Sequence, residues 1–148
     1  MLKINAKAPD FVLKNQNNEE VELSQLLKSG PAVVYFYPKD ETPGCTAEAC
    51  AFRDSFEDFT DANIKVVGIS SDGVEAHKQF AKKYNLPFDL LADTTKSVAK
   101  LYDVKKTLGF IPGRVTYVVD ENQTIVHAFD SLLNAKQHVK EALSKIKK

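Results

Sequence analysis

Residues 38–50, which read PKDETPGCTAEAC, hold both cysteines of the chain and decide how the rest of it is interpreted. Directly before them, residues 31–37 (PAVVYFY) form a continuous apolar run that is typical of a strand buried on both faces. Pro43 favours the first position of a helix, which makes Thr42 the N-cap and places Cys45 in the first turn. The sequence therefore predicts a strand, a turn and a helix that presents a cysteine at its start.

On the C-terminal side of this stretch the chain continues in helices and strands. Three phenylalanines at helical spacing predict a single helix that continues to about residue 63: Phe52, Phe56 and Phe59. A second buried strand is expected at 64–70, followed by a helix that Ser71 or Asp72 caps and that ends at Asn85. Residues 88–91 are expected to be extended, and Thr94 or Thr95 to start a further helix.

The two ends of the chain each predict a pair of antiparallel strands. Near the N-terminus, residues 11–13 and 21–23 flank a polar turn, and Ser24 is expected to cap a brief helix after them. Near the C-terminus, residues 108–113 are expected to form a loop, and residues 115–119 and 124–129 a second hairpin. Asn134 is expected to cap a final helix.

Strands that alternate with helices, followed by an antiparallel pair, indicate a partly parallel sheet covered on both faces. The order therefore predicts an α/β protein with a thioredoxin-like fold, in which a central mixed β-sheet is flanked by helices and begins with an N-terminal β-hairpin. No linker, repeat or low-complexity segment interrupts the sequence, so residues 1–148 are expected to form a single domain.

The composition excludes several classes of partner. Twenty lysines and arginines balance 20 aspartates and glutamates, so no net charge favours nucleic acid or a membrane surface. No apolar run approaches the length of a secretory signal or of a membrane span, which needs about 18 residues. We therefore expect no nucleic-acid or membrane partner and a cytoplasmic location. The sequence leaves open whether a targeting segment has been removed.

Cys45 has the features of a reactive thiol. The thiolate is the nucleophilic form of cysteine, and the positive end of a helix dipole stabilises it. The alternative is that Cys45 is a small buried apolar residue. The polar, turn-forming neighbours at 39–44 argue against that alternative.

Cys50 follows Cys45 by five residues, a spacing that an intact helix does not allow to close into a disulfide. Helix geometry puts the two Cα atoms about 8–9 Å apart, beyond the limit of about 7 Å for a disulfide. The first turns of the helix must therefore unwind if the two cysteines bond. The sequence predicts two states, a helix with free thiols and a locally melted segment with a disulfide.

A metal site is not expected. Zinc would need two more ligands beside the cysteines, and His77, His127 and His138 show no ligand-like spacing. The Cys-x-x-x-x-Cys spacing also differs from the Cys-x-x-Cys of thioredoxin-type redox pairs. We therefore expect no metal and no other cofactor.

The pattern Pro38-x-x-x-Thr42-x-x-Cys45 resembles the active-site motif of the peroxiredoxins. The longer run at 35–54 (YFYPKDETPGCTAEACAFRD) is similar to the PrxQ branch, the bacterioferritin comigratory proteins. The resemblance extends to 112–120 (PGRVTYVVD) and to 134–143 (NAKQHVKEAL), so it covers nearly the whole chain.

The resemblance implies a role for each residue of the motif. Cys45 corresponds to the peroxidatic cysteine, and Cys50 to the resolving cysteine found in the same helix in many members of the branch. The Thr42 hydroxyl is expected to bond the thiolate and the peroxide, Pro38 to shield the pocket from water, and Arg114 to approach from the strand side.

Two further positions belong to the expected site. Gly44 lies within the stretch that binds the peroxide, and Glu48 occupies a position that is often acidic or an amide, with a supporting role. Arg53, two turns after Cys45 on the same helix, is instead expected to pair locally with an acid such as Asp54 or Glu57.

The function implied is a thioredoxin-dependent, antioxidant peroxidase that reduces hydrogen peroxide and alkyl or other organic hydroperoxides. Peroxide oxidises Cys45 to a sulfenic acid, Cys50 condenses with it to a disulfide, and thioredoxin or glutaredoxin reduces the disulfide. Members of this branch are often monomers, so we expect a monomer. The alternatives are a redox-sensing module and a disulfide-exchange carrier, either of which would use the two cysteines without peroxidase turnover.

Overall fold

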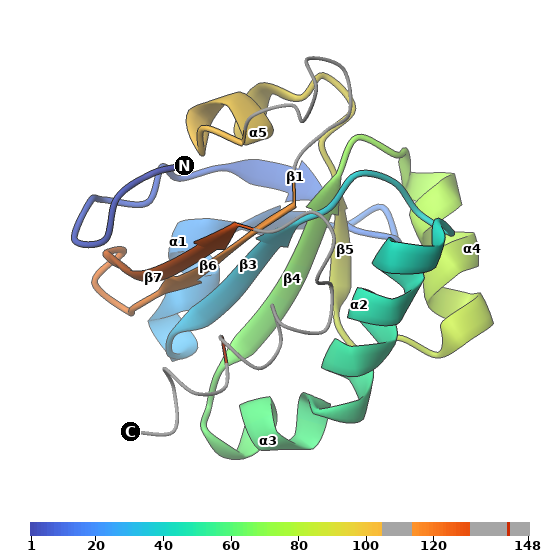
Figure 1. Ribbon diagram of the computed structural model, residues 1–148, viewed down its shortest axis with the longest axis horizontal. Coiled ribbons are helices and arrows are strands. Elements are labelled where there is room, and N and C mark those ends of the chain that lie inside the picture. The colour runs from blue at the N-terminus through green and yellow to red at the C-terminus, as the bar shows by residue number, and fades with distance from the viewer. Residues whose placement is uncertain (105–113, 131–141, 143–148) are drawn as a thin grey trace.

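In the computed structural model of the protein, which describes residues 1–104, 114–130 and 142, a seven-stranded sheet separates helices on its two faces (Figure 1). The strands are β1 (Val12–Lys14), β2 (Glu20–Glu22), β3 (Ala32–Phe36), β4 (Lys65–Ser70), β5 (Asp89–Ala92), β6 (Val115–Val119) and β7 (Ile125–Asp130). The helices are α1 (Leu23–Leu26), α2 (Pro43–Asp54), α3 (Phe56–Asp61), α4 (Val74–Tyr84) and α5 (Ser97–Leu101), with a 3₁₀ turn η1 at Leu27–Ser29.

The sheet has the strand order β2-β1-β5-β4-β3-β6-β7. Strand β3 is parallel to β4, and β4 to β5, whereas the other neighbouring pairs are antiparallel. The predicted mixed sheet is therefore confirmed, and so are the hairpins β1–β2 at one margin and β6–β7 at the other. The fold agrees with the predicted thioredoxin-like arrangement.

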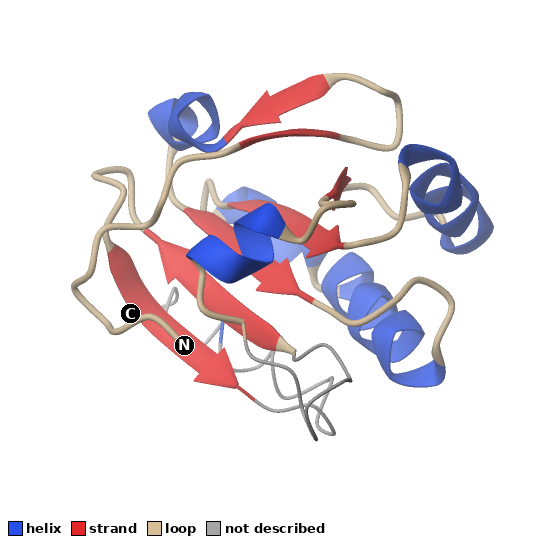
Figure 2. Cartoon of the chain, turned by 90° about the horizontal axis from the view of Figure 1, so that it is seen from above, coloured by secondary structure: helices blue, strands red, loops and turns tan. Residues whose placement is uncertain are grey.

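Strand β3 lies inside the sheet and is buried along its whole length, as its apolar run predicts. Its side chains alternate between the two faces. Val33 and Tyr35 pack with residues of α2, α3 and α4, and Val34 and Phe36 pack on the opposite face, with residues of α1 and α5. Figure 2 shows helices on both sides of the strand layer.

The helix after the cysteine stretch differs from the prediction. It is divided into α2 and α3 at Ser55, whose φ of −100° and ψ of 6° end the first helix and start the second. Phe52 and Phe59 are still fully buried in one core cluster, against which Phe56 packs. The helical spacing of the three phenylalanines therefore identified the buried face but not the break in the backbone.

The predicted caps at Ser24 and at Ser71 or Asp72 are wrong, because the N-caps are Glu22 and Gly73. The last of these helices begins at Ser97, after the predicted start at Thr94 or Thr95. Carboxylates from preceding loops bond two of the helix starts instead. Asp10 accepts the N–H of Ser24 at 2.9 Å, and Asp93 accepts the N–H groups of Val98 and Ala99 at 3.2 and 2.9 Å. Asn85 ends α4 in the left-handed conformation, with φ 53°, as predicted.

Two predictions fall on residues outside the described ranges, the loop at 108–113 and the helix that Asn134 caps. Of the last segment, Ala142 is described: it is helical and fully buried in the core cluster on the face of α2, α3 and α4. Among the described residues, no helix is long and apolar enough to cross a membrane.

Candidate active site

The turn from β3 into α2 delivers Cys45 to a helix N-terminus. The chain passes half-buried Pro38 and then Glu41, whose φ of 62° is a left-handed conformation that costs energy for a residue with a side chain. Thr42 is extended and is the N-cap, and Pro43 takes the first helical position, as predicted. Cys45 is the third residue of α2 and is 1% exposed. The helix start therefore directs its positive end at a buried thiol.

Arg114 reaches the same thiol from the sheet. It directly precedes β6, and Phe36 of β3 pairs with Val115 of β6, so the register brings Arg114 to the end of β3 where the cysteine loop begins. Its side chain is buried, and Nη2 donates to the Sγ of Cys45 at 3.2 Å. A guanidinium in hydrogen-bond contact with sulfur stabilises the thiolate over the thiol.

Glu48 holds the other side of this guanidinium. It lies one turn after Cys45 on α2, is fully buried, and accepts a short hydrogen bond from Nη1 of Arg114. Burial raises the pKa of Glu48 to about 8, an effect that the guanidinium of Arg114 opposes. Burial lowers the pKa of Arg114, but the charges of Glu48 and Cys45 raise it, and the net change is upward.

Thr42 does not cap the helix through its side chain. Its hydroxyl donates to the carbonyl of Lys39 at 2.9 Å, and the structure gives no cap hydrogen bond to it. The oxygen of this hydroxyl still has lone pairs with which to accept a hydrogen bond from a peroxide. The predicted cap is thus right in position and wrong in its hydrogen bond.

Gly44 lies in the first turn, directly beside the guanidinium. A Cβ at this position would lie 3.1 Å from Nη2 of Arg114. The absence of a side chain at Gly44 therefore leaves the space that the arginine occupies next to Cys45.

Cys50 lies half-buried, further along α2. Both cysteines are free, and α2 is continuous from Pro43 to Asp54. This is the first of the two states predicted from the spacing, in which an intact helix keeps the thiols apart. Arg53 makes the predicted local ion pair, with Asp54 at 3.1 Å, and also donates to the carbonyl of Tyr84 at 2.7 Å.

Pro38 borders a cavity of about 290 Å³ between the ends of β3 and β4 and the segment around α5. The cavity's described lining includes Phe36, Ile69 and Lys100, but neither Thr42 nor Cys45. The structure thus places Pro38 next to the active-site loop, on the edge of a cavity that the thiol does not line.

The sequence reasoning missed a buried polar cluster beside the loop. Asp40, His77 and Tyr37 contact one another through side-chain atoms and are all buried. A signal was present, because residue 77 falls on the same helical face as Phe80, three positions before it. That spacing is compatible with a packed histidine, but the contact of His77 with the loop cannot be deduced from it.

Comparisons with known proteins agree over nearly the whole chain. A model of the AhpC/TSA family matches residues 4–128. Peroxiredoxin Q, chloroplastic, of Sedum lineare is 51% identical over 136 residues, which are 91% of this chain and 73% of that protein. The protein of the same name from Arabidopsis thaliana is 48% identical over 141 residues, which are 95% of this chain and 65% of that protein.

Solved structures also match over nearly the whole chain. The crystal structure of peroxidoxin BcpB from Mycobacterium tuberculosis has a TM-score of 0.93 and 34% identity, and the match covers 99% of this chain and 97% of that one. A bacterioferritin comigratory protein of Xanthomonas campestris, described for its alkyl peroxide reduction activity, has a TM-score of 0.85 and 27% identity, and the match covers 100% and 99%.

Proposed function

Because the chain belongs to the AhpC/TSA family and is a peroxiredoxin, a thiol-dependent peroxidase, we propose that Cys45 is its peroxidatic nucleophile and that hydrogen peroxide and alkyl hydroperoxides are its substrates. One observation carries the assignment. The Sγ of Cys45 lies in the first turn of α2 and accepts a hydrogen bond from buried Arg114 at 3.2 Å.

The first step is a displacement at oxygen. The thiolate sulfur of Cys45 attacks the terminal peroxide oxygen, an S–O bond forms, and the O–O bond breaks. The sulfur becomes a sulfenic acid, and the alkoxide or hydroxide that leaves takes up a proton. Negative charge spreads along S–O–O in the transition state, and it is stabilised by Arg114 and by the N–H groups at the helix start. Thr42 and Gly44 border the peroxide, and Pro38 limits its access to water.

The second step forms a disulfide within the chain. The sulfur of Cys50 attacks the sulfenic sulfur of Cys45, and water leaves. A dithiol protein, thioredoxin in this proposal or else glutaredoxin, then reduces the disulfide in two thiol exchanges. The Xanthomonas campestris relative's alkyl peroxide reduction supports the choice of alkyl hydroperoxides as substrates.

We also propose that the protein is a monomer and that it lies in a reducing compartment, which we take to be the cytoplasm. The support is chemical, because recycling requires a reduced dithiol partner and both cysteines lie within one helix. The Sedum lineare and Arabidopsis thaliana relatives are named chloroplastic, so the compartment rests on the need for a reductant alone.

Peroxide consumption with thioredoxin, its reductase and NADPH tests this function on wild type and three variants. Wild type is expected to consume peroxide continuously, and Cys45→Ser is expected to consume none. Cys50→Ser is expected to react once, to a sulfenic acid that dimedone traps, and then to stop. Arg114→Lys is expected to slow the oxidation of Cys45 by about tenfold to a hundredfold, since it loses the planar donor pair.

For the oxidation of Cys45, Arg53→Lys is the matched control for Arg114→Lys, because Arg53 lies on the same helix as Cys45 and contacts Asp54 and Tyr84 instead of the thiol. Turnover by Cys45→Ser would refute the peroxidase assignment. A wild-type protein that exchanges its disulfide with partner proteins but consumes no peroxide would also refute it. The redox-sensing and disulfide-exchange alternatives predict that result. The comparisons with peroxidases do not favour those alternatives.

A further inference from the structure

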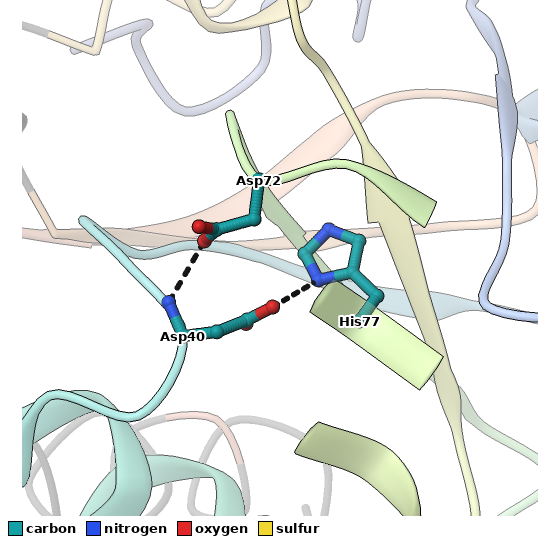
Figure 3. Close-up of side chains that lie close together, drawn as sticks. All are labelled: Asp40, Asp72 and His77. Carbon is teal, nitrogen blue, oxygen red and sulfur yellow. Dashed lines mark hydrogen bonds and ion pairs between the residues drawn. The ribbon is translucent and has the colours of Figure 1, made fainter. Parts of the chain in front are cut away.

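Beside the active-site loop, three ionisable side chains from different parts of the chain meet (Figure 3). Asp40 belongs to the loop between β3 and α2, two residues before the N-cap Thr42. Asp72 follows β4, and His77 comes from α4. Asp40 and His77 are buried, with side chains 5% and 0% exposed. The cluster therefore joins the start of the cysteine helix to a neighbouring helix inside the protein.

Both ring nitrogens of His77 make hydrogen bonds. Nε2 lies 3.0 Å from the carbonyl oxygen of Leu91, which can only accept, so Nε2 must donate. Nδ1 lies 2.6 Å from Oδ2 of Asp40, so one proton lies between this nitrogen and the carboxyl group. His77 and Asp40 therefore share a proton in a short, buried contact.

The other groups that face His77 do not supply this proton. The hydroxyl of Tyr37 donates to Oδ1 of Asp40 at 2.5 Å and lies 3.4 Å from Nδ1 of His77. Burial, with the charge of Asp40, raises the pKa of Tyr37 well above its usual value, so the phenol keeps its proton. Both oxygens of the Asp40 carboxyl group therefore take part in buried hydrogen bonds.

Asp72 completes the cluster without contacting the imidazole. Its Oδ2 accepts the N–H of Asp40 at 2.8 Å and the hydroxyl of Ser70 at 2.7 Å. The potential ligand atoms of the three side chains lie within 4.8 Å of one another. Asp40 and His77 are in direct contact at 2.6 Å, however, and a cation between them would have to break that bond. We therefore interpret the cluster as a buried hydrogen-bonded pair of Asp40 and His77, with Asp72 bonded to the backbone beside it.

We propose that His77 and Asp40 are positioning residues for Cys45, because their buried contact holds the loop at 38–42 and thus the start of α2 against α4. The inference rests on the proposed peroxidase function. On the solvent side, Lys83 pairs with Glu41 at 3.0 Å between the same loop and helix, but both side chains are exposed, so this contact contributes little. The buried pair is the main fixed point before Cys45.

A second fixed point lies after Cys50. Arg53 donates to the carbonyl of Tyr84 at the end of α4. Both cysteines therefore lie between two attachments to α4, at Asp40 and at Arg53. The unwinding that a Cys45–Cys50 disulfide requires is confined to the chain between these attachments, and the helix N-terminus reforms in register after reduction.

Removal of the His77 donor would leave the Asp40 carboxyl unpaired at a buried contact, which releases the loop. The full-length reduced protein tests this in two measurements at neutral pH: hydrogen exchange of the amides at 40–46 and the rate of Cys45 oxidation by hydrogen peroxide. His77→Leu removes the donor, His77→Asn keeps an uncharged donor of similar reach towards Asp40, and Lys83→Ala is the control that removes the exposed ion pair.

His77→Leu is expected to exchange at 40–46 about tenfold faster than wild type and to react with peroxide several-fold more slowly. His77→Asn is expected to lie between wild type and His77→Leu in both quantities, because it restores a donor towards Asp40. Lys83→Ala is expected to change each quantity less than twofold.

Wild-type loop exchange in His77→Leu would overturn the proposal. So would His77→Asn values equal to those of His77→Leu, because a donor towards Asp40 would then have no effect. If His77→Leu fails to fold, His77→Asn decides, because its loop exchange must exceed that of wild type while Lys83→Ala stays within twofold. The exchange needs no peroxide, so a protein whose loop exchange responds to His77→Asn but that has no peroxidase activity would refute the proposed function and leave the loop attachment standing.

Discussion

Arg114 donates hydrogen bonds to two acceptors at the centre of the site. One guanidinium nitrogen lies 3.2 Å from the sulfur of Cys45, and the other donates to the buried carboxyl of Glu48. Glu48 fixes the plane of the guanidinium, so the donor aimed at the sulfur is in place before the peroxide arrives. Preorganised donors of this kind lower the energy of the transition state because they need not reorient during the reaction.

The space at Gly44 is part of this arrangement. Gly44→Ala would put a methyl group 3.1 Å from Nη2 of Arg114, so the guanidinium must shift by a few tenths of an ångström. We expect Cys45 oxidation to slow by about threefold to tenfold. Stability is expected to hold or rise, because alanine is the better helix former by about 1 kcal/mol. Stopped-flow oxidation and urea unfolding measure the two effects.

Gly73→Ala is the control for this substitution, since a Cβ there meets nothing within 4 Å. It is expected to leave the oxidation rate unchanged. An oxidation rate for Gly44→Ala equal to that of wild type would show that the position of the guanidinium does not limit the reaction.

At the residue scale, the sequence identified the side chains that the family motif carries and missed those that it does not. Cys45 and Arg114 could be assigned, and the structure brings them into contact. His77 could be expected to pack, from its place on a helical face, but its bond to Asp40 depends on how α4 lies against the loop. No local pattern encodes that distance.

At the scale of the element, the sequence predicts the start of helix α2 well and its end poorly. Pro43 and the extended Thr42 fix the start, because proline lacks the N–H that an interior helix position needs. The end at Ser55 was not predicted, because the phenylalanine spacing continues across it. The caps of α1 and α5 were missed for a related reason, since carboxylates outside the local motif reach the helix starts.

The buried face of α2 carries Glu48, which gives this helix a pH dependence. Burial raises the pKa of Glu48 to about 8 in the folded protein, whereas the unfolded chain keeps the ordinary value of 4.5. The contribution to stability is therefore complete below pH 4.5 and is lost as the pH rises through 8. In wild type, the free energy of unfolding is expected to fall by a few kcal/mol across this range.

Glu48→Gln removes the titrating group and keeps an acceptor for Arg114, so this part of the pH dependence is expected to disappear. Urea unfolding between pH 4.5 and 8.5 measures the difference, with the exposed Glu57→Gln on α3 as control. Equal slopes of unfolding free energy against pH in wild type and Glu48→Gln would contradict the assignment of a raised pKa.

At the scale of the molecule, the sheet brings together the two halves of the site. Cys45 follows β3, and Arg114 precedes β6, 69 residues later. The antiparallel pairing of Phe36 with Val115 sets them side by side. The sequence predicted both strands and a mixed sheet, but the strand order and register are products of packing across the whole chain. Only the family resemblance allowed Arg114 to be placed at the thiol in advance.

The fold also limits how much of the chain changes when Cys45 passes from attack on the peroxide to the disulfide with Cys50. The described structure has free thiols and an intact α2, and a Cys45–Cys50 disulfide requires its first turns to unwind. Strand β3 before the site is buried within the sheet and α4 beside it holds the contacts at Asp40 and Arg53. Oxidation should therefore change a short segment and leave the surrounding sheet unchanged.

Hydrogen exchange measured by mass spectrometry, on the reduced protein and after one equivalent of hydrogen peroxide, tests this switch most directly. We predict that the oxidised protein contains a Cys45–Cys50 disulfide and that the amides at 43–50 lose protection, while those of β3 and β4 keep it. A disulfide between these cysteines with unchanged protection at 43–50, or oxidation that ends without this disulfide, would contradict the account.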